Sequence, residues 1–315
     1  MSLTIRFLGT SASRPTVERN VSALAIVRDG ETLLVDCGEG TQRQMMRYGI
    51  SFGLSDILFT HYHTDHVLGL IGLLHTIQLG GGRIEPLHLW GPKGLTKFVQ
   101  RAEAFAGELH GFPIEQHELE PGVPVKRPGY EILPFPVDHR GARAVGYALI
   151  EETRLGRFNP DLARDFGIPE GPLWGRLHRG QSVTLDDGRT IDAAMLVGPS
   201  RPGRRIAITG DTRPTDATIA AAQGADLLVH EATFGDDEAA RAVETGHSTA
   251  REAATIAERA GVRRLVITHF SARYTRDSSE LETQAREVFP STSCARDGLE
   301  IDVPFAVEEE AESAA

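Results

Sequence analysis

Short apolar segments separated by turns occupy the first part of the chain, a pattern typical of β-strands. Residues 3–8, 21–27 and 32–35 each form such a segment, and each is followed by a turn that contains glycine. Three consecutive strands with short connections predict a β-meander at the start of the fold.

Segments with helical character alternate with further strands along the rest of the chain. Residues 67–79 are apolar on all sides, which predicts a buried helix, and the alanine-rich residues 249–260 predict another. Two more helices are predicted at 41–48 and 94–107, and strands at 57–60, 86–90, 130–137, 145–151, 205–209, 226–230 and 264–268.

Glycine and proline interrupt this alternation between residues 153 and 205. The pattern there favours an inserted, flexible arm rather than part of the core. The stretch 154–205 also holds nine arginines and six acidic residues, a local excess of positive charge in an acidic chain.

Three predicted strands end in a residue that binds metals in many proteins. Residues 56–61 and 264–269 each end in Thr-His, and residues 206–211 end in Gly-Asp. Since ligands of α/β sheets bind at the carboxyl ends of strands, these three ends are expected to share a site. Two β-rich halves with helices predict an α/β fold (α+β in some classifications). The expected architecture is a four-layer αββα sandwich. It forms a single domain over 1–315, with a protruding arm at 153–205.

Composition places the chain among globular proteins of the cytoplasm. Of its 315 residues 40% are hydrophobic and 24% charged, and residues 67–79, its longest apolar run, are too short to span a bilayer. Neither a secretory signal nor a disulfide framework is indicated, because only Cys37 and Cys294 occur. A cytoplasmic location without membrane contact is therefore expected.

The net charge of −11, taken as a whole, argues against a nucleic-acid partner. The distribution weakens that argument, since residues 300–315 contain six acidic residues and no basic one. We expect 306–315 to form a disordered acidic tail.

The densest chemical signal is His61-Tyr-His63-Thr-Asp65-His66, directly after the predicted strand 57–60. Alternation along an extended segment puts His61, His63 and Asp65 on one side, and the turn into the next helix brings His66 beside them. Four such ligands would crowd one metal but can be divided between two, and zinc is the usual occupant of such sites. Isolated histidines carry no such signal and are expected to be ordinary residues: His75, His88, His110, His117 and His178.

Other strand ends supply the remaining candidate ligands. His139, Asp211 and His269 each follow a predicted strand. With the first motif they complete seven ligands, enough for two metal sites.

Further motifs surround these ligands. They are Phe7-Leu-Gly-Thr-Ser-Ala, Arg19-Asn-Val, Val35-Asp-Cys-Gly-Glu-Gly-Thr-Gln, Gly210-Asp-Thr-Arg-Pro, His230-Glu-Ala-Thr-Phe, His247-Ser-Thr-Ala and Ile267-Thr-His-Phe-Ser-Ala-Arg-Tyr. With them the chain resembles the metallo-β-lactamase superfamily and, within it, the ribonuclease Z family of tRNA 3′-processing endonucleases. The resemblance implies two zinc ions per subunit, replaceable by manganese or another divalent ion. It assigns His61, His63 and His139 to one ion, Asp65, His66 and His269 to the other, and Asp211 to both.

The resemblance also implies a reaction. Water activated by the two metals attacks the phosphodiester that joins the 3′ trailer to precursor tRNA, which leaves a 3′-hydroxyl on the tRNA and a 5′-phosphate on the trailer. Asp65 would accept the proton, His247 would donate one to the leaving oxygen, and Glu231 would orient His247. A purely structural alternative for His247 is a place before a helix whose N-cap is Ser248.

Substrate binding follows from the same resemblance. The arm would grip tRNA through backbone contacts, with Gly171-Pro172 resembling the Gly-Pro motif of the family's arm. Arg273 is a candidate for phosphate contact, with a purely structural role as the alternative. The family is typically a homodimer in which one arm serves the other active site. Val17 replaces a lysine that many members carry in the loop associated with the tRNA 3′ end, so the treatment of precursors that bear CCA is open.

Two other functions fit the metal ligands. A general zinc phosphodiesterase acting on small substrates would have no need of an arginine-containing arm, and a non-catalytic RNA-binding protein would be expected to have lost ligands. No nicotinamide or flavin cofactor is expected.

Overall fold

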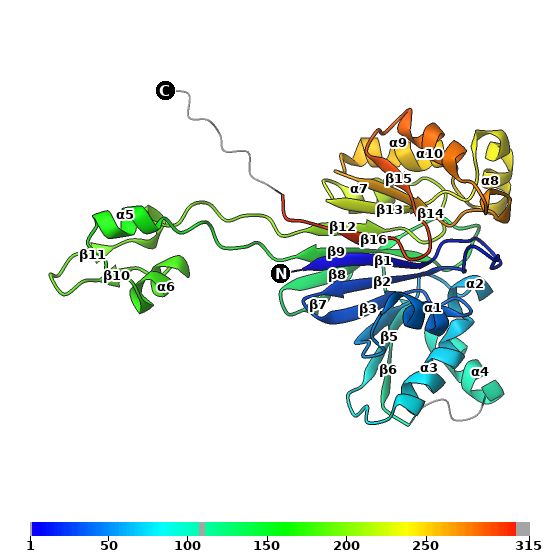
Figure 1. The fold of residues 1–315 in the computed structure, drawn as a ribbon, viewed down its shortest axis with the longest axis horizontal. Coiled ribbons are helices and arrows are strands. Elements are labelled where there is room, and N and C mark those ends of the chain that lie inside the picture. Colours follow the sequence, from blue (N-terminus) through cyan, green and yellow to red (C-terminus); the bar gives the residue numbers. More distant parts are fainter. Residues whose placement is uncertain (1, 107–110, 307–315) are drawn as a thin grey trace.

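Two seven-stranded sheets pack face to face in this computed structural model, which describes residues 2–106 and 111–306 (Figure 1). The first sheet has the order β16-β1-β2-β3-β4-β5-β6. Its strands are β1 Leu3–Gly9, β2 Ala23–Arg28, β3 Glu31–Val35, β4 Asp56–Leu58, β5 Leu87–Pro92, β6 Ile114–Leu119 and β16 Glu300–Asp302. The first three form an antiparallel meander, as predicted, and β3 to β6 are parallel.

The second sheet has the order β15-β14-β13-β12-β9-β8-β7, with parallel strands from β12 to β15. Its strands are β7 Val125–Arg127, β8 Tyr130–Pro136, β9 Val145–Glu151, β12 Arg205–Ile208, β13 Leu227–Glu231, β14 Leu265–Thr268 and β15 Thr292–Cys294. The sequence did not predict β6, β7, β15 or β16. Three of these have only three residues and β6 is mostly polar, so their apolar pattern is too short or too weak to recognise.

Helices cover the outer face of each sheet (Figure 1). The first sheet carries α1 Thr41–Tyr48, α2 Thr64–Val67, α3 Gly69–Gly80 and α4 Leu95–Ala106, and the second carries α7 Asp216–Ala222, α8 Ala239–Thr245, α9 Ala250–Ala260 and α10 Ser279–Arg286. Three single turns of 3₁₀-helix are η1 Ala193–Met195, η2 Asp236–Glu238 and η3 Ala272–Tyr274. One apolar core lies between the sheets and one lies under each helical layer. The predicted four-layer αββα sandwich is thus confirmed.

The predicted helix at 67–79 corresponds to α3, which begins two residues later, because the chain breaks at Leu68 after the short helix α2. At the break the chain contacts the end of β3: Cys37 N–H donates to His66 O at 2.7 Å and Gly69 N–H to Cys37 O at 2.8 Å. A Cβ at residue 69 would lie 2.0 Å from Gly38 O, so this contact requires glycine. The break holds α2, which carries Asp65 and His66, against the strand ends.

The segment between β9 and β12 projects far from the sandwich as an arm (Figure 1). It is more regular than the sequence suggested: helices α5 Pro160–Asp165 and α6 Pro172–His178 and a hairpin of β10 Val183–Thr184 with β11 Thr190–Ile191 enclose a small core. That core contains Ala163, Ile168, Leu177, Val183, Ile191, Ala193 and Leu196. The arm is therefore a folded module on two stems.

A buried ion-pair cluster joins the arm to the sandwich. Both carboxylate oxygens of Glu151 accept from Arg204, at 2.7 Å each, and Oε1 also accepts from Arg28 Nε at 2.8 Å. Burial alone would raise the pKa of Glu151, but hydrogen bonds from Arg204 and Arg28 outweigh it and hold that pKa below its usual range.

Replacing Glu151 by glutamine is expected to lower the free energy of unfolding by about 3 kcal/mol, because it leaves the guanidinium of Arg204 buried without a countercharge. A carboxyl with a depressed pKa stabilises the fold above its unfolded pKa, and this contribution is lost as the pH falls through the folded value. The difference between wild type and variant in urea unfolding should therefore be full at pH 7 and shrink toward acid pH. A constant difference at every pH would contradict the assignment.

None of the helices within 2–106 and 111–306 has the length and apolar character needed to cross a membrane. His110 and nearly all of the predicted acidic tail at 306–315 lie outside the described residues.

Candidate metal centre

Loops at the carboxyl ends of four strands meet on one side of the sandwich. His61 follows β4, His139 follows β8, Asp211 follows β12 and His269 follows β14 directly. All four residues are at least 97% buried. Strands from both sheets thus contribute to a single site.

The short helix α2 brings the next two residues to the same place. His63 is its N-cap residue, and Asp65 and His66 lie in its first turns. The expectation that Asp65 continues an extended segment is therefore wrong; the helical turn, and not strand alternation, directs Asp65 and His66 toward His269.

The seven residues form two adjacent groups in which each residue offers one ligand atom and these atoms lie within 4.8 Å of one another. The first group is His61, His63, His139 and Asp211, and the second is Asp65, His66 and His269. This is the division that the family resemblance implies.

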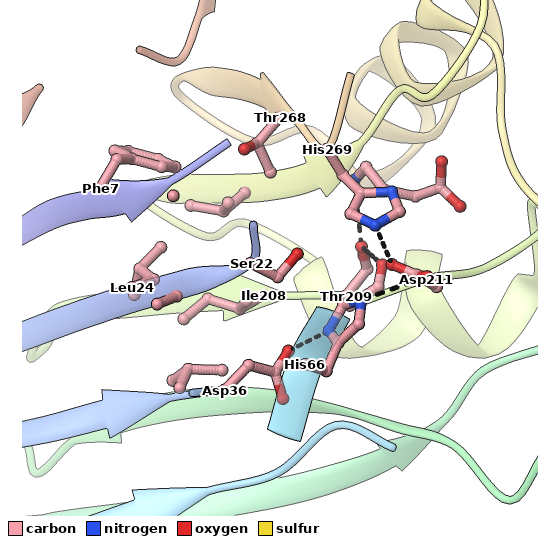
Figure 2. Close-up of a pocket in the computed structure, with 16 residues that line it drawn as sticks. Phe7, Ser22, Leu24, Asp36, His66, Ile208, Thr209, Asp211, Thr268 and His269 are labelled. Atoms are coloured by element: carbon pink, nitrogen blue, oxygen red, sulfur yellow. Dashed lines mark hydrogen bonds and ion pairs between the residues drawn. The ribbon is translucent and has the colours of Figure 1, made fainter. Parts of the chain in front are cut away.

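Asp211 lies between the groups. Its Oδ2 is 3.7 Å from His61 Nε2, 3.8 Å from His139 Nε2 and 3.4 Å from His66 Nε2, and its Oδ1 is 3.3 Å from His269 Nε2. Figure 2 shows this carboxylate facing His66 and His269. One carboxylate in this place is suited to contact a metal in each group.

Hydrogen bonds at the far side of three imidazoles prepare them as metal ligands. The Nδ1 atoms of His66, His139 and His269 lie 2.7 Å from Asp36 Oδ2, 2.8 Å from Gly246 O and 2.9 Å from Thr233 Oγ1. An Nδ1–H that donates to such an oxygen leaves the Nε2 lone pair free for a metal.

Several buried polar atoms of the centre form no hydrogen bond. Within the described part of the chain, His61 Nε2, His66 Nε2, His269 Nε2 and Asp211 Oδ1 are buried without a hydrogen-bond partner. Buried polar atoms are rarely left so, and four of them converging on one place fit metal ions. Imidazole and carboxylate together suit divalent ions such as zinc.

The sequence analysis missed the residues that orient these ligands. Asp36 Oδ1 accepts from Thr60 N–H and its Oδ2 from the Thr60 hydroxyl, both at 2.8 Å, and that hydroxyl lies 3.1 Å from His61 Nδ1. Asp36 thus fixes His66 directly (Figure 2). It fixes His61 through Thr60. The available signal was an aspartate at the end of β3, beside the strand that leads to His61.

Glu231 is buried beside the centre and accepts five hydrogen bonds. Its Oε1 accepts from Thr212 N–H at 2.9 Å and lies 2.8 Å from His247 Nδ1, and its Oε2 accepts from Thr233 N–H, the Thr233 hydroxyl and Ser248 N–H. Glu231 therefore orients His247 directly and His269 through Thr233.

The charge of Glu231 also sets the protonation of His247. Burial would lower the pKa of His247, but Glu231, assisted by Asp211, raises it to about 9. This shift favours the protonated form of the His247 imidazole. Its ring lies 4.9 Å from that of His139 and 5.4 Å from that of His269, next to both metal groups.

The structural alternative for His247 is wrong in its detail. The N-cap of α9 is Thr249, not Ser248, and Thr249 forms a capping box with Glu252. The Ser248 hydroxyl donates to Thr212 O at 2.6 Å instead.

Comparison with known proteins agrees with this geometry. The sequence profile of the Metallo-beta-lactamase superfamily matches residues 16–189, and that of the Beta-lactamase superfamily domain matches 176–270. A protein named Ribonuclease Z from Gemmatimonas aurantiaca is 63% identical over 98% of both chains, and one from Myxococcus xanthus is 52% identical over 96% of this chain and 98% of its own. The chain belongs to the ribonuclease Z family of the metallo-β-lactamase superfamily.

A solved structure supports the same assignment. The crystal structure of the short form of human tRNase Z is 28% identical and matches with a TM-score of 0.70, covering 96% of this chain and all of that one. The chain has the fold of this family, and its cluster of histidine and aspartate ligands is a divalent metal site.

The substrate-binding predictions fall in two separate places. Arg273 lines a surface pocket next to His247, together with Arg14 and Arg241, and forms an ion pair with Glu238. Gly171 and Pro172 instead begin α6 in the arm, on the side of the molecule away from the metal centre (Figure 1). The structure therefore does not bring these two places together within one chain.

Replacing Glu231 by glutamine is expected to lower kcat by about 10- to 100-fold with a smaller change in KM, because His247 loses its anionic partner but the substrate pocket stays intact. The effect should shrink when His247 is already asparagine, since both changes act on one group. Steady-state kinetics of both single variants and the double variant measure this. Additive losses would show that Glu231 acts independently of His247.

Proposed function

We propose that this protein is a zinc-dependent endoribonuclease that removes the 3′ trailer from precursor tRNA. Cleavage leaves a 3′-hydroxyl on the tRNA and a 5′-phosphate on the trailer. The relatives named Ribonuclease Z align with it along almost the whole chain, and the human tRNase Z structure shares its fold. We place the reaction in the cytoplasm.

The observation that carries the proposal is a divided metal cluster with His247 beside it, held by a hydrogen bond to the buried carboxylate of Glu231. Asp211 lies between the two ligand groups, and His247 Nδ1 lies 2.8 Å from Glu231 Oε1 and 3.9 Å from Asp211 Oδ2. Hydrolysis of a phosphodiester requires both parts, a site for two cations and an acid for the leaving oxygen.

His61, His63 and His139 would hold one zinc ion, Asp65, His66 and His269 the other, and Asp211 both. When bound, the two ions act as Lewis acids toward the phosphodiester and favour deprotonation of the attacking water. Their charge offsets the carboxylates of the site, so an acidic chain presents a positive pocket to RNA.

The chain's own residues transfer the protons. Asp65 Oδ2 accepts from Ser13 N–H at 2.7 Å, which fixes the carboxylate that takes the proton of the attacking water. The bond between phosphorus and the tRNA 3′-oxygen then breaks, and that oxygen takes a proton from His247. The phosphate stays on the trailer.

Recognition of tRNA would use two basic regions. Arg14, Arg241 and Arg273 line the pocket beside His247 and suit the phosphates that flank the cut. The arm would contact the tRNA body at a distance, where A-form RNA is recognised through its backbone.

Placement of the arm favours a homodimer. β12 begins at the arm with Arg205 and runs toward Asp211, so the arm and the metal centre of one chain lie at opposite ends of the same strand (Figure 1). In a symmetric dimer the arm of one subunit would reach the substrate of the other.

Complementation tests this arrangement. A chain without its arm and a chain with Asp65→Ala are each expected to be strongly impaired on precursor tRNA, whereas refolding them together should restore much of the activity in mixed dimers. Absence of recovery, although mixed dimers are isolated, would contradict the shared arrangement.

The function itself is tested with a precursor tRNA that bears a 3′ trailer, incubated with zinc, with manganese and with a chelator. One metal-dependent cut beside the discriminator base, with the predicted end groups, is the expected result. The alternative, a zinc phosphodiesterase for small substrates, predicts no cut in this RNA but rapid hydrolysis of a small phosphodiester by the same preparation.

A further inference from the structure

A second group of candidate metal ligands lies outside the catalytic centre. His88 is on β5, and Glu115 and His117 are on β6, the last strand of the first sheet. In the parallel register His88 is opposite Glu115, and Glu115 and His117 are two residues apart, so all three side chains share one face. The sequence analysis treated both histidines as isolated residues, but strand pairing brings them together.

Their ligand atoms have the spacing of a metal site. His88 Nδ1 lies 3.2 Å from His117 Nε2 and 3.3 Å from Glu115 Oε2, and His117 Nε2 lies 3.7 Å from the same oxygen. Ligands about 2.0–2.1 Å from a tetrahedral zinc ion are about 3.3 Å from one another. The three atoms therefore match one face of a zinc tetrahedron. His63 and His139 in the catalytic centre have the same spacing, 3.2 Å between their ring nitrogens.

Surrounding residues fix the histidines and balance the nearby charge. The ring of His117 stacks on Trp90 with centroids 3.9 Å apart, and Trp90 Nε1 donates to the buried Asp56 at 2.6 Å. Arg127 lies over the Trp90 ring and is ion-paired with Asp56.

The open side of the group faces solvent. The side chains of Glu115 and His117 are 53% and 33% exposed, so water or another solvent ligand can complete the coordination. His88 pairs in register with Asp56 of β4, at the start of the strand that ends before His61. The group thus lies at the end of the sheet away from the catalytic centre.

We propose that His88, Glu115 and His117 form an additional zinc site that joins the outermost strand β6 to β5. Two imidazoles and one carboxylate from two strands make it a cross-strand clamp, which stabilises an edge of the sheet rather than taking part in hydrolysis. The proposal does not depend on the function proposed above.

Metal counting tests it on the full chain. Four proteins are loaded with zinc and freed of unbound metal by gel filtration: wild type, His117→Asn, Glu115→Gln and His75→Asn. Inductively coupled plasma mass spectrometry then measures the zinc content per chain. His75 is an exposed histidine of α3 outside the described ligand groups and serves as the matched control. Wild type and His75→Asn should hold about one zinc ion per chain more than the other two variants.

Stability gives a second readout. Zinc beyond the amount that fills the catalytic centre should raise the Tm of wild type and His75→Asn by a few degrees and leave that of Glu115→Gln unchanged. Glu115 is exposed, so its variant should fold normally. In Asp211→Ala, where the catalytic centre is impaired, the additional ion should remain and should still disappear with His117→Asn. Equal zinc content in all four proteins, or a loss in His75→Asn as large as in His117→Asn, would overturn the proposal.

Discussion

Replacing Asp65 by alanine is expected to lower kcat for precursor tRNA by about 10³-fold or more. The change removes both a metal ligand and the carboxylate that accepts the proton of the attacking water, and general-base catalysis by itself contributes about 10²–10⁴-fold. Asp65 Oδ2 is 3.6 Å from His66 Nε2 and 3.5 Å from His269 Nε2, so the second metal group loses its carboxylate. Single-turnover cleavage of an end-labelled precursor measures the effect.

Two controls separate chemistry from folding. Asp216→Ala removes an exposed carboxylate at the start of α7 and should leave the rate unchanged. Asp65→Asn keeps the shape of the side chain but not its charge, and it should be impaired even where its zinc content equals that of wild type. A rate within tenfold of wild type for Asp65→Ala would refute the role of Asp65 as proton acceptor.

Removing the arm is expected to lower kcat/KM for precursor tRNA by about 10²–10³-fold, because backbone contacts supply much of the affinity for a folded RNA. Arg154 and Arg201 pair across the stems, with backbone hydrogen bonds of 2.7 Å and 2.9 Å. A short Gly-Ser linker from residue 154 to 201 therefore deletes the arm at a natural junction. The sandwich should stay folded, because the arm has its own core.

The response to substrate size and to salt distinguishes binding from catalysis. Hydrolysis of a small phosphodiester should be unchanged in the deletion variant, since the metal centre receives nothing from its own arm. Arg176→Gln with Arg179→Gln should weaken the salt dependence of KM for tRNA, whereas Arg259→Gln on α9 should not. Equal loss on the RNA and on the small substrate would show that the arm supports the fold and not recognition.

Elements with strong local patterns were predictable from the sequence. The meander, α1 and β9 lie where the apolar pattern placed them, because alternation and turn residues act over a few neighbouring positions. Elements with weak or divided patterns could not be predicted from the sequence. The arm appeared irregular because its helices are six and seven residues long and are stabilised by packing against each other. The break at Leu68 likewise depends on a contact with β3 that no local pattern reveals.

The same distinction between local pattern and tertiary contact applies to the catalytic centre. The sequence by itself determined the seven candidate ligands, since metal-binding residues gather at strand ends and the first four occur within six positions. Only the tertiary structure decided which oxygen holds each imidazole, that Asp211 lies between the two groups, and that Glu231 joins His247 to Thr233. It also decided that His88 and His117 are neighbours. The physical reason is that each of these contacts joins strands or loops far apart in the chain, so their geometry arises only when the sheets pair and pack.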